Sequence, residues 1–270
     1  MSEYLSHHTE NNNIKKHPFH LVDPSPWPLT TTISVLLVTI GAVLSMHKID
    51  HIVLGMGVLS LLFNLFMWWR DVSKESNEVG VHTKEVQTGL KLGMGLFIAS
   101  EIMLFAAFFW GYFHTALFPG EVLENVWPPK GIKTLDPLEL PYFNTLLLLL
   151  SGTTLTWSHY SLTAGNRLDT LKGLGLTVLL GIVFLIIQMV EYVHAPFHFK
   201  DGIYPSLFYI TTGFHGFHVL VGTIFLAVCC FRVYRNTITQ DHHVGFETAA
   251  WYWHFVDVIW LFLFVSIYWW

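Results

Sequence analysis

Seven long apolar runs restrict what this chain can fold into. They are separated by shorter polar segments and cover residues 29–46, 52–69, 88–117, 142–162, 171–194, 205–234 and 245–270. Each run has about the length of the roughly 20 residues that an α-helix needs to cross a bilayer. The chain is 53% hydrophobic and only 12% charged, whereas soluble domains carry about 25% charged residues. The sequence therefore predicts an all-α integral membrane protein with seven transmembrane helices.

The polar residues outside these runs indicate one membrane domain without a soluble partner domain. We expect a polar tail over residues 1–28, the first two helices within residues 29–69 and the other five within residues 88–270. The tail contains acids and lacks Arg, so it resembles neither a signal peptide nor a transit peptide. This pattern suits a bacterial inner-membrane protein or one made inside an organelle. The Lys and Arg residues form no cluster that would predict binding to nucleic acid.

The distribution of Lys and Arg predicts the orientation of the chain. With seven helices, ten of the 14 Lys and Arg residues lie on the side of the N-terminus, and only Lys48, Lys130, Lys133 and Lys200 lie on the other side. Positively charged loops stay on the cytoplasmic side of a membrane or on its organelle equivalent. We therefore expect the N-terminus in the cytoplasm of a bacterium or in the mitochondrial matrix.

Ionisable side chains inside the apolar runs are the candidates for chemistry. Glu101 lies near the middle of the third run, where a charged group costs roughly 2.5 to 3.5 kcal/mol on insertion scales and normally faces protein, a cavity, a lipid headgroup or a proton route. The others are Glu191, His215, His218, Glu247, His254 and Asp257, with His159 and His194 nearer the ends. His215 with His218, Glu191 with His194 and His254 with Asp257 are three residues apart, so each pair shares a helix face. For His254 and Asp257 we expect a mutual hydrogen bond that makes burial tolerable.

Two other interpretations of this set stay open on the residues alone. The 16 histidines would allow an independent membrane haem protein, because histidines on facing helices can hold haem iron. Scattered polar groups would also suit a transporter, although transporter sites favour broken helices in repeated halves. The chain has no CxxC, CxxCH or HExxH motif, and Cys229 and Cys230 are adjacent, which prevents them from easily sharing a metal on a helix.

A lipid site is the third candidate. Aromatic and basic residues gather on the expected inner side of the membrane: Trp68, Trp69, Arg70, His82, Arg232, Arg235, His242 and His243. Cations and aromatic rings at one interface suit a phospholipid headgroup. Solvated charges that merely set the orientation explain the same residues about equally well.

Several sequence segments are more specific. HPFHLVDPSPWPL, SEIMLFAAFFWGYFHTAL, VWPPKGI with DPLELPYFNT, DGIYPSLFYITTGFHGFHVLVGTIFL and HHVGFETAAWYWHFVDVIWLFLFVSIYWW occur in this order. They closely resemble the subunit 3 family of haem-copper cytochrome c oxidases of the aa3 type, from about His17 to Trp270. The tail before His17 is unlike most members, and the chain stops just short of the Gly-Ser ending that many members show.

This resemblance implies a seven-helix fold in which helices one and two splay from helices three to seven around a V-shaped cleft filled with phospholipid. It implies a non-catalytic subunit of an oxidoreductase that reduces oxygen with electrons from cytochrome c and pumps protons. Its partners would be catalytic subunit 1, in direct contact, subunit 2 and further accessory subunits. Haem a, haem a3 and copper would lie in partner subunits, and this chain would hold only structural phospholipid. Its role would be to stabilise the catalytic subunit, sustain proton uptake and give oxygen a path.

The resemblance also assigns the lipid site. Trp69, His82, Glu101 and Arg232 match family positions that line the cleft and contact lipid, and Trp68, His242 and His243 are added because they neighbour these positions. No catalytic or metal-binding residue is expected. The implied location is the mitochondrial inner membrane with the N-terminus in the matrix, and the alternative is a bacterial inner membrane.

Overall fold

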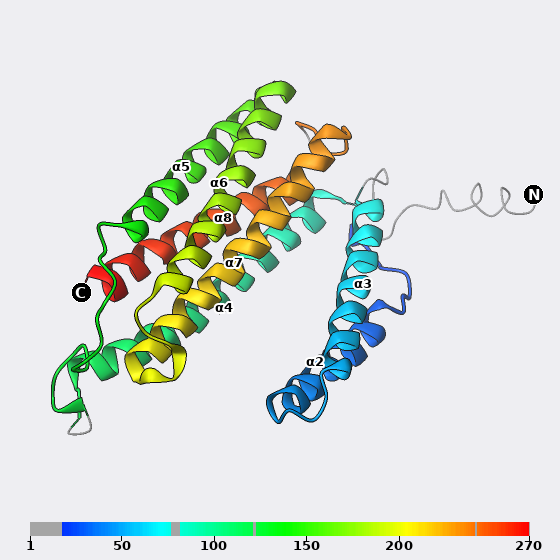
Figure 1. The fold of residues 1–270 in the computed structure, drawn as a ribbon. Helices are drawn as coiled ribbons and strands as arrows, with labels where there is room; N and C mark the ends of the chain where they lie inside the picture. The colour runs from blue at the N-terminus through cyan, green and yellow to red at the C-terminus, as the bar shows by residue number, and fades with distance from the viewer. Residues whose placement is uncertain (1–17, 77–81, 121–122, 241, 270) are drawn as a thin grey trace, which may run out of the picture. The chain divides into compact units, whose positions relative to one another are not determined.

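The structure is a computed structural model that describes residues 18–76, 82–120, 123–240 and 242–269. The described residues form helices and loops and include no strand (Figure 1). The seven long helices are α2 (Trp27–Met46), α3 (Ile52–Glu75), α4 (Lys84–Leu117), α5 (Leu140–Thr163), α6 (Arg167–His194), α7 (Ile203–Tyr234) and α8 (Val244–Leu263). A short 3₁₀ helix, η2 (Phe199–Asp201), precedes α7, and α8 continues as a π-helix, η3 (Phe264–Trp269). The predicted seven-helix fold is confirmed.

The helices extend beyond the apolar runs by a few polar residues. α3 continues past Trp69 to Glu75, and α4 begins at Lys84 rather than at Thr88. A helix satisfies its own backbone N–H and C=O groups, so it can continue from the hydrocarbon into the polar interface without a break. Hydropathy therefore locates the part of a helix that lies in the membrane better than it locates the ends of the helix.

Six of the described helices are long and apolar enough to cross a membrane, and α5 is the exception. α5 is less apolar because it carries several Ser and Thr residues. Two of these hydroxyl groups face α6: Thr154 Oγ1 lies 2.8 Å from Thr177 Oγ1, and Ser158 Oγ donates to the Thr170 carbonyl over 2.8 Å. Part of the polar surface of α5 is thus paired with a neighbouring helix, as small polar residues in membrane bundles commonly are.

The chain divides into two compact units, Met1–Gly89 and Leu90–Trp270. In the first unit, α2 and α3 form a helical hairpin around a polar line. Ser34 Oγ lies 2.6 Å from Ser60 Oγ and accepts a hydrogen bond from Asn64 Nδ2 over 2.9 Å. The helices approach closely at glycines: a Cβ atom on Gly57 would lie only 2.7 Å from the backbone nitrogen of Val38. The single membrane domain and the V-shaped cleft stay predictions.

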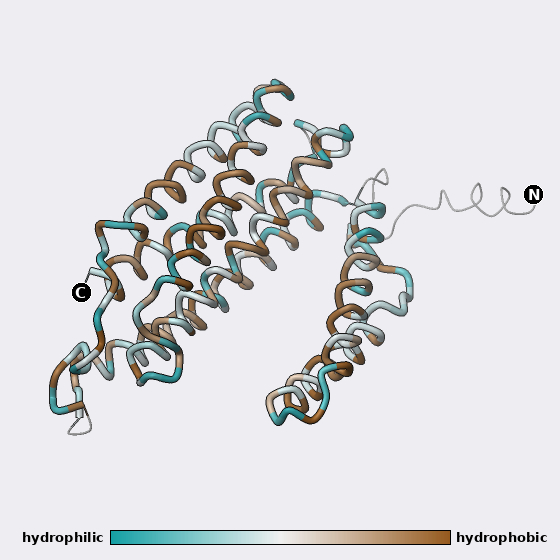
Figure 2. The backbone as a smooth tube through the Cα atoms, viewed as in Figure 1, coloured by the Kyte–Doolittle hydropathy of each residue, from teal (hydrophilic) through white to brown (hydrophobic). Residues whose placement is uncertain are grey.

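The second unit is a bundle of α5 to α8 with the part of α4 that follows Leu90. These helices run side by side in Figure 1, and Figure 2 shows that hydrophobic residues cover most of their length while hydrophilic residues concentrate in the loops. Such helices suit an apolar solvent on the outside of the bundle.

Trp253 joins four helices of this bundle. Its side chain is fully buried, and its indole N–H donates to Ser151 Oγ on α5 over 2.9 Å. The ring is held between two glycines: a Cβ atom on Gly181 of α6 would lie 2.7 Å from the ring, and one on Gly222 of α7 would lie 2.9 Å from it. Close packing at small residues therefore fixes one face of α8 against α5, α6 and α7.

Candidate functional site

The residues predicted to bind lipid lie in both units. In the first unit, Trp68 and Trp69 lie on the polar end of α3, and His82 lies just before α4. The Trp69 side chain is 66% exposed, and Trp68 and His82 are half-buried. The His82 ring lies 5.9 Å from the His20 ring, between centroids. These residues present aromatic surface at one end of the hairpin.

A hydrogen bond that the sequence does not predict lies at this end of the hairpin. Trp27, at the start of α2, donates from its indole N–H to Asp71 Oδ2 over 2.8 Å. Arg70 donates to the other oxygen, Asp71 Oδ1, from Nε over 3.1 Å and from Nη2 over 3.0 Å. The negative charge of Asp71 therefore offsets the positive charge of Arg70, the residue next to Trp69. No pattern in the sequence connects Trp27 with a residue 44 positions away.

In the second unit, Glu101 pairs with a histidine on a neighbouring helix. Its Oε2 lies 2.8 Å from Nε2 of His218 on α7, and the two side chains are only 17% and 8% exposed. His218 Nδ1 lies 2.7 Å from the carbonyl oxygen of Phe214. The rings of Phe105 and Tyr252 lie 5.1 Å and 6.3 Å from the His218 ring. Glu101 is therefore a partner in a helix-to-helix hydrogen bond surrounded by aromatic rings.

The basic residues of the second unit gather where α7 ends and α8 begins. Arg232 lies in the last turn of α7, and its Nη1 would lie 3.6 Å from a Cβ atom on Gly245 of α8. His243 precedes α8, and its ring lies 6.2 Å from the His159 ring on α5. The Nδ1 atom of His243 is buried without a hydrogen-bond partner, whereas His242 is exposed. The structure thus brings Arg232 and His243 to the same end of the bundle.

An ion pair lies at the same end. Lys91 Nζ lies 2.6 Å from Glu247 Oε2, which links α4 to the first turn of α8. Glu247 was expected as an ionisable group inside a span, but it is partly exposed near the helix end and is neutralised by Lys91. Because Lys91 neutralises the charge of Glu247, less negative charge remains near Arg232 and His243.

Two of the predicted intrahelical pairs have other partners. Glu191, 2% exposed, accepts hydrogen bonds at Oε1 from the Tyr268 hydroxyl over 2.7 Å and from Gln188 Nε2 over 3.1 Å. His194 instead contacts the Val190 carbonyl through Nδ1, over 2.8 Å. His215, the expected partner of His218, contacts the Val256 carbonyl of α8 through Nε2 over 3.1 Å. Glu191 and His215 thus gain a partner from another part of the chain, whereas His194 bonds within its own helix.

The expected hydrogen bond between His254 and Asp257 is absent among the described contacts, so that prediction is wrong. Asp257 Oδ1 is buried without a partner. Asp257 Oδ2 and His254 Nδ1 both face α5, where they would lie 3.0 Å and 3.7 Å from a Cβ atom on Gly152. The small residue on α5 allows both polar side chains to lie against its backbone, and no donor of the described chain reaches the carboxyl group.

The described polar groups of the bundle mainly connect helices to one another. Among the residues that the structure describes, no three His, Cys, Asp or Glu side chains come close enough to hold a metal ion. Cys229 packs against α8, with its Sγ 3.8 Å from the Gly245 carbonyl oxygen. Across the two units, the described residues provide cations and exposed aromatic rings near helix ends. They also provide polar pairs that hold helices together.

Comparison with known proteins gives one consistent result. The family model described as cytochrome c oxidase subunit III matches residues 17–270. The cytochrome c oxidase subunit 3 of Prototheca wickerhamii is 54% identical over 259 residues, which cover 95% of this chain and 99% of that protein. The subunit 3 of Arabidopsis thaliana is 52% identical, over 95% of this chain and 97% of that protein. The probable cytochrome c oxidase subunit 3 of Rickettsia bellii is 52% identical, over 94% of this chain and 96% of that protein.

A family match over nearly the whole chain agrees with the seven helices and with the order of the five sequence segments quoted above. The chain belongs to the cytochrome c oxidase subunit III family.

Proposed function

We propose that this chain stabilises the catalytic subunit of a cytochrome c oxidase and binds structural phospholipid. Membership of the family makes it a multi-pass membrane subunit of an oxidoreductase complex, and we assign no redox centre to this chain. The alternative of an independent haem protein or transporter is not favoured. The family match over residues 17–270 is the observation that carries the assignment to the complex.

The finer roles belong to the proposal. We assign haem a, haem a3 and copper to partner subunits, and a direct contact to subunit 1, with subunit 2 and accessory subunits in the same complex. Support for proton uptake and an oxygen path are further roles that the family resemblance implies. The location we propose is the mitochondrial inner membrane with the N-terminus in the matrix. Because a relative from Rickettsia bellii is 52% identical, a bacterial inner membrane with a cytoplasmic N-terminus is the alternative.

Two groups of residues support lipid binding, each within its own unit. In the second unit, Arg232, His242 and His243 lie at the junction of α7 and α8, where the Lys91 to Glu247 ion pair neutralises the nearby acid. A cation near the surface contributes about 1 kcal/mol to the binding of an anionic lipid. In the first unit, Trp68, Trp69 and His82 offer the amphipathic rings that prefer the headgroup level. Glu101 is included on resemblance alone, because its carboxyl group is bonded to His218.

The test of this proposal compares Arg232→Ala with Arg235→Ala in the purified oxidase. Arg235, at the end of the same helix, stacks its guanidinium over the Phe231 ring at 5.1 Å and serves as the matched control. We expect the Arg232 variant to bind phospholipid about fivefold more weakly, the equivalent of about 1 kcal/mol. It should inactivate sooner during turnover while its initial rate stays close to that of the wild type.

Phospholipid is counted by mass spectrometry of the complex, and the turnover lifetime is followed by oxygen consumption. An immediate loss of the haem spectrum or of the initial rate in Arg232→Ala would contradict the proposed role, because a lipid-binding residue should affect durability rather than chemistry. Equal lipid loss in both variants would indicate a general effect of positive charge.

A further inference from the structure

A buried polar network joins three elements at the end of the bundle where α5 begins and α6 ends. Asn144 Nδ2 on α5 donates to Gln188 Oε1 on α6 over 3.4 Å. Gln188 Nε2 donates to Glu191 Oε1 over 3.1 Å, and the hydroxyl of Tyr268 on η3 donates to the same oxygen over 2.7 Å. Asn144, Gln188, Glu191 and Tyr268 are all buried, with exposed fractions of 0% to 6%. The network is therefore enclosed by protein.

Two oxygen atoms of this network have no hydrogen-bond donor. They are Glu191 Oε2 and Asn144 Oδ1, and both are buried. Their side chains bond to the same Gln188 carboxamide, so the two oxygens belong to one small region. A buried acceptor without a donor costs free energy comparable to a lost hydrogen bond or more. Two such oxygens in one network therefore call for a donor.

The neighbouring tyrosines already donate elsewhere. Tyr192, the residue after Glu191, donates from its hydroxyl to Thr212 Oγ1 on α7 over 2.7 Å. Tyr209, whose ring lies 5.2 Å from that of Tyr192, donates to the Phe197 carbonyl over 2.9 Å. No Lys, Arg or His of the described residues forms an ion pair with Glu191. A donor for the unpaired oxygens must therefore come from outside the described chain.

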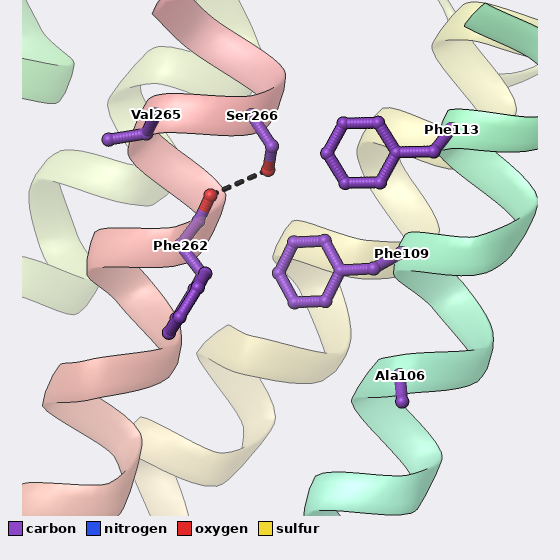
Figure 3. Close-up of a pocket in the computed structure, with 6 residues that line it drawn as sticks. All are labelled: Ala106, Phe109, Phe113, Phe262, Val265 and Ser266. Atoms are coloured by element: carbon purple, nitrogen blue, oxygen red, sulfur yellow. Dashed lines mark hydrogen bonds between the residues drawn. The ribbon is translucent and has the colours of Figure 1, made fainter. Parts of the chain in front are cut away.

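An apolar groove beside the same π-helix gives a contrast (Figure 3). It has a volume of about 580 Å³ and is lined by Ala106, Phe109, Phe113, Phe262, Val265 and Ser266. Ser266 is the polar residue of this lining, and its hydroxyl donates to the Phe262 carbonyl over 2.6 Å. The groove therefore suits apolar groups, whereas the unpaired oxygens lie in the interior network.

The position and the size of the interior site favour water as the donor. Asn144 is the fifth residue of α5, and Glu191 lies three residues before the end of α6, so both are within about 6 Å of a helix end along the axis. The polar interface is therefore close. Internal waters typically make about three hydrogen bonds to buried groups that would otherwise be unpaired. Water also fits either protonation state of Glu191, because it both donates and accepts.

Other ligands fit this site less well. A hard cation such as Ca²⁺ takes about six to eight oxygen ligands, and the unpaired oxygens number two. The described residues also hold no cluster of three His, Cys, Asp or Glu side chains for a metal ion. A lipid headgroup is too large for a site that is closed on all sides by buried residues.

We propose that Glu191 and Asn144 form an internal water site, in which at least one bound water donates to Glu191 Oε2 and Asn144 Oδ1. The water completes the network that joins α5, α6 and the C-terminal π-helix. This inference goes beyond the proposed function and does not depend on it, because it uses only the interior of this chain.

The first test is hydroxyl radical labelling of the purified oxidase in heavy-oxygen water. X-ray pulses split water into hydroxyl radicals, which react with adjacent side chains before they diffuse away. Tyr268 should gain labelled oxygen although it is buried. Tyr112, which is 1% exposed and packs against the rings of Phe113 and Trp127, should gain none. Mass spectrometry of the peptides measures both, and equal labelling of the two tyrosines, or an unlabelled Tyr268, would overturn the proposal.

The second test compares two substitutions on α5. Asn144→Leu removes one ligand of the water, and we expect Tyr268 to lose its label. Thr145→Val is the matched control, because it removes a different buried hydrogen bond, the one from the Trp260 indole over 2.9 Å; it should keep the label. An unchanged label in Asn144→Leu, or an equal loss in both variants, would overturn the proposal. If Asn144→Leu does not accumulate, the comparison of Tyr268 with Tyr112 in the wild type decides alone.

Discussion

The Glu101 carboxyl group and the His218 ring share one hydrogen atom between them. The Phe214 carbonyl can only accept, so His218 Nδ1 must carry a hydrogen. The other ring nitrogen, Nε2, lies 2.8 Å from Glu101 Oε2, and one further hydrogen must lie between these two atoms. With the hydrogen on either atom, Glu101 Oε2 or His218 Nε2, the hydrogen bond joins the middle of α4 to the middle of α7.

The first residue-scale prediction concerns this contact. Glu101→Ala leaves His218 Nε2 buried without a partner, and we expect it to lower the free energy of unfolding by about 1–3 kcal/mol. Glu101→Gln keeps a side-chain amide that can donate to Nε2, so it should lose less than half of that amount. Thermal unfolding of the purified complex measures both. Equal midpoints for Ala and Gln would show that the hydrogen bond contributes little.

The polar residues inside the spans can be recognised from the sequence, but their hydrogen-bond partners cannot. The spacing of three residues correctly placed His254 and Asp257 on one helix face, because both face Gly152. Spacing did not predict hydrogen-bond partners. The partner of Glu191, for example, is Tyr268, which lies 77 residues away. Hydrogen-bond partners across helices depend on which helices are neighbours and on their rotation, and neither is encoded in local spacing.

At the scale of single elements, the α2 and α3 hairpin depends on glycine. A Cβ atom on Gly57 would lie 2.7 Å from the Val38 nitrogen and 2.9 Å from the Leu37 carbonyl carbon. Both neighbours are backbone atoms, which cannot rotate away as a side chain can. Gly55, on the same helix, has no atom within 4 Å of its added Cβ. The two glycines therefore differ in packing while they share a helix and a depth in the membrane.

This difference gives the element-scale prediction. Gly57→Ala should force the helices apart and lower the free energy of unfolding by about 1–3 kcal/mol. Gly55→Ala should leave it unchanged or raise it by up to about 1 kcal/mol, since Ala is the better helix former. Unfolding of the full chain by SDS in mixed micelles, followed by circular dichroism, measures both variants. A stable Gly57→Ala hairpin would contradict the close approach of α2 and α3.

The whole molecule has a predicted orientation that its basic residues alone determine. Lys74 follows the membrane part of α3 on the expected inner side, and Lys200 precedes α7 on the expected outer side. Both are exposed. The excess of Lys and Arg on the N-terminal side sets this orientation through the positive-inside rule.

A labelling experiment tests this orientation. On a background with Cys229→Ala and Cys230→Ala, a membrane-impermeant maleimide applied from outside should label Lys200→Cys in intact vesicles. It should label Lys74→Cys only after the membrane is permeabilised, with an accessibility ratio of about ten or more between the two sites. Labelling of Lys74→Cys in intact vesicles would reverse the proposed topology.

Seven long helices and the family of the chain could both be predicted from the sequence, and both predictions are confirmed. A bilayer requires every backbone group to be paired within its helix, so apolar runs of sufficient length have few alternatives to the helix. Which polar groups meet, as Glu101 and His218 do, and which buried oxygen, Asp257 Oδ1, lacks a partner become visible in the folded chain alone. The physical reason is that membrane helices are held together by close packing and by individual hydrogen bonds, whose geometry depends on residues far apart in the chain.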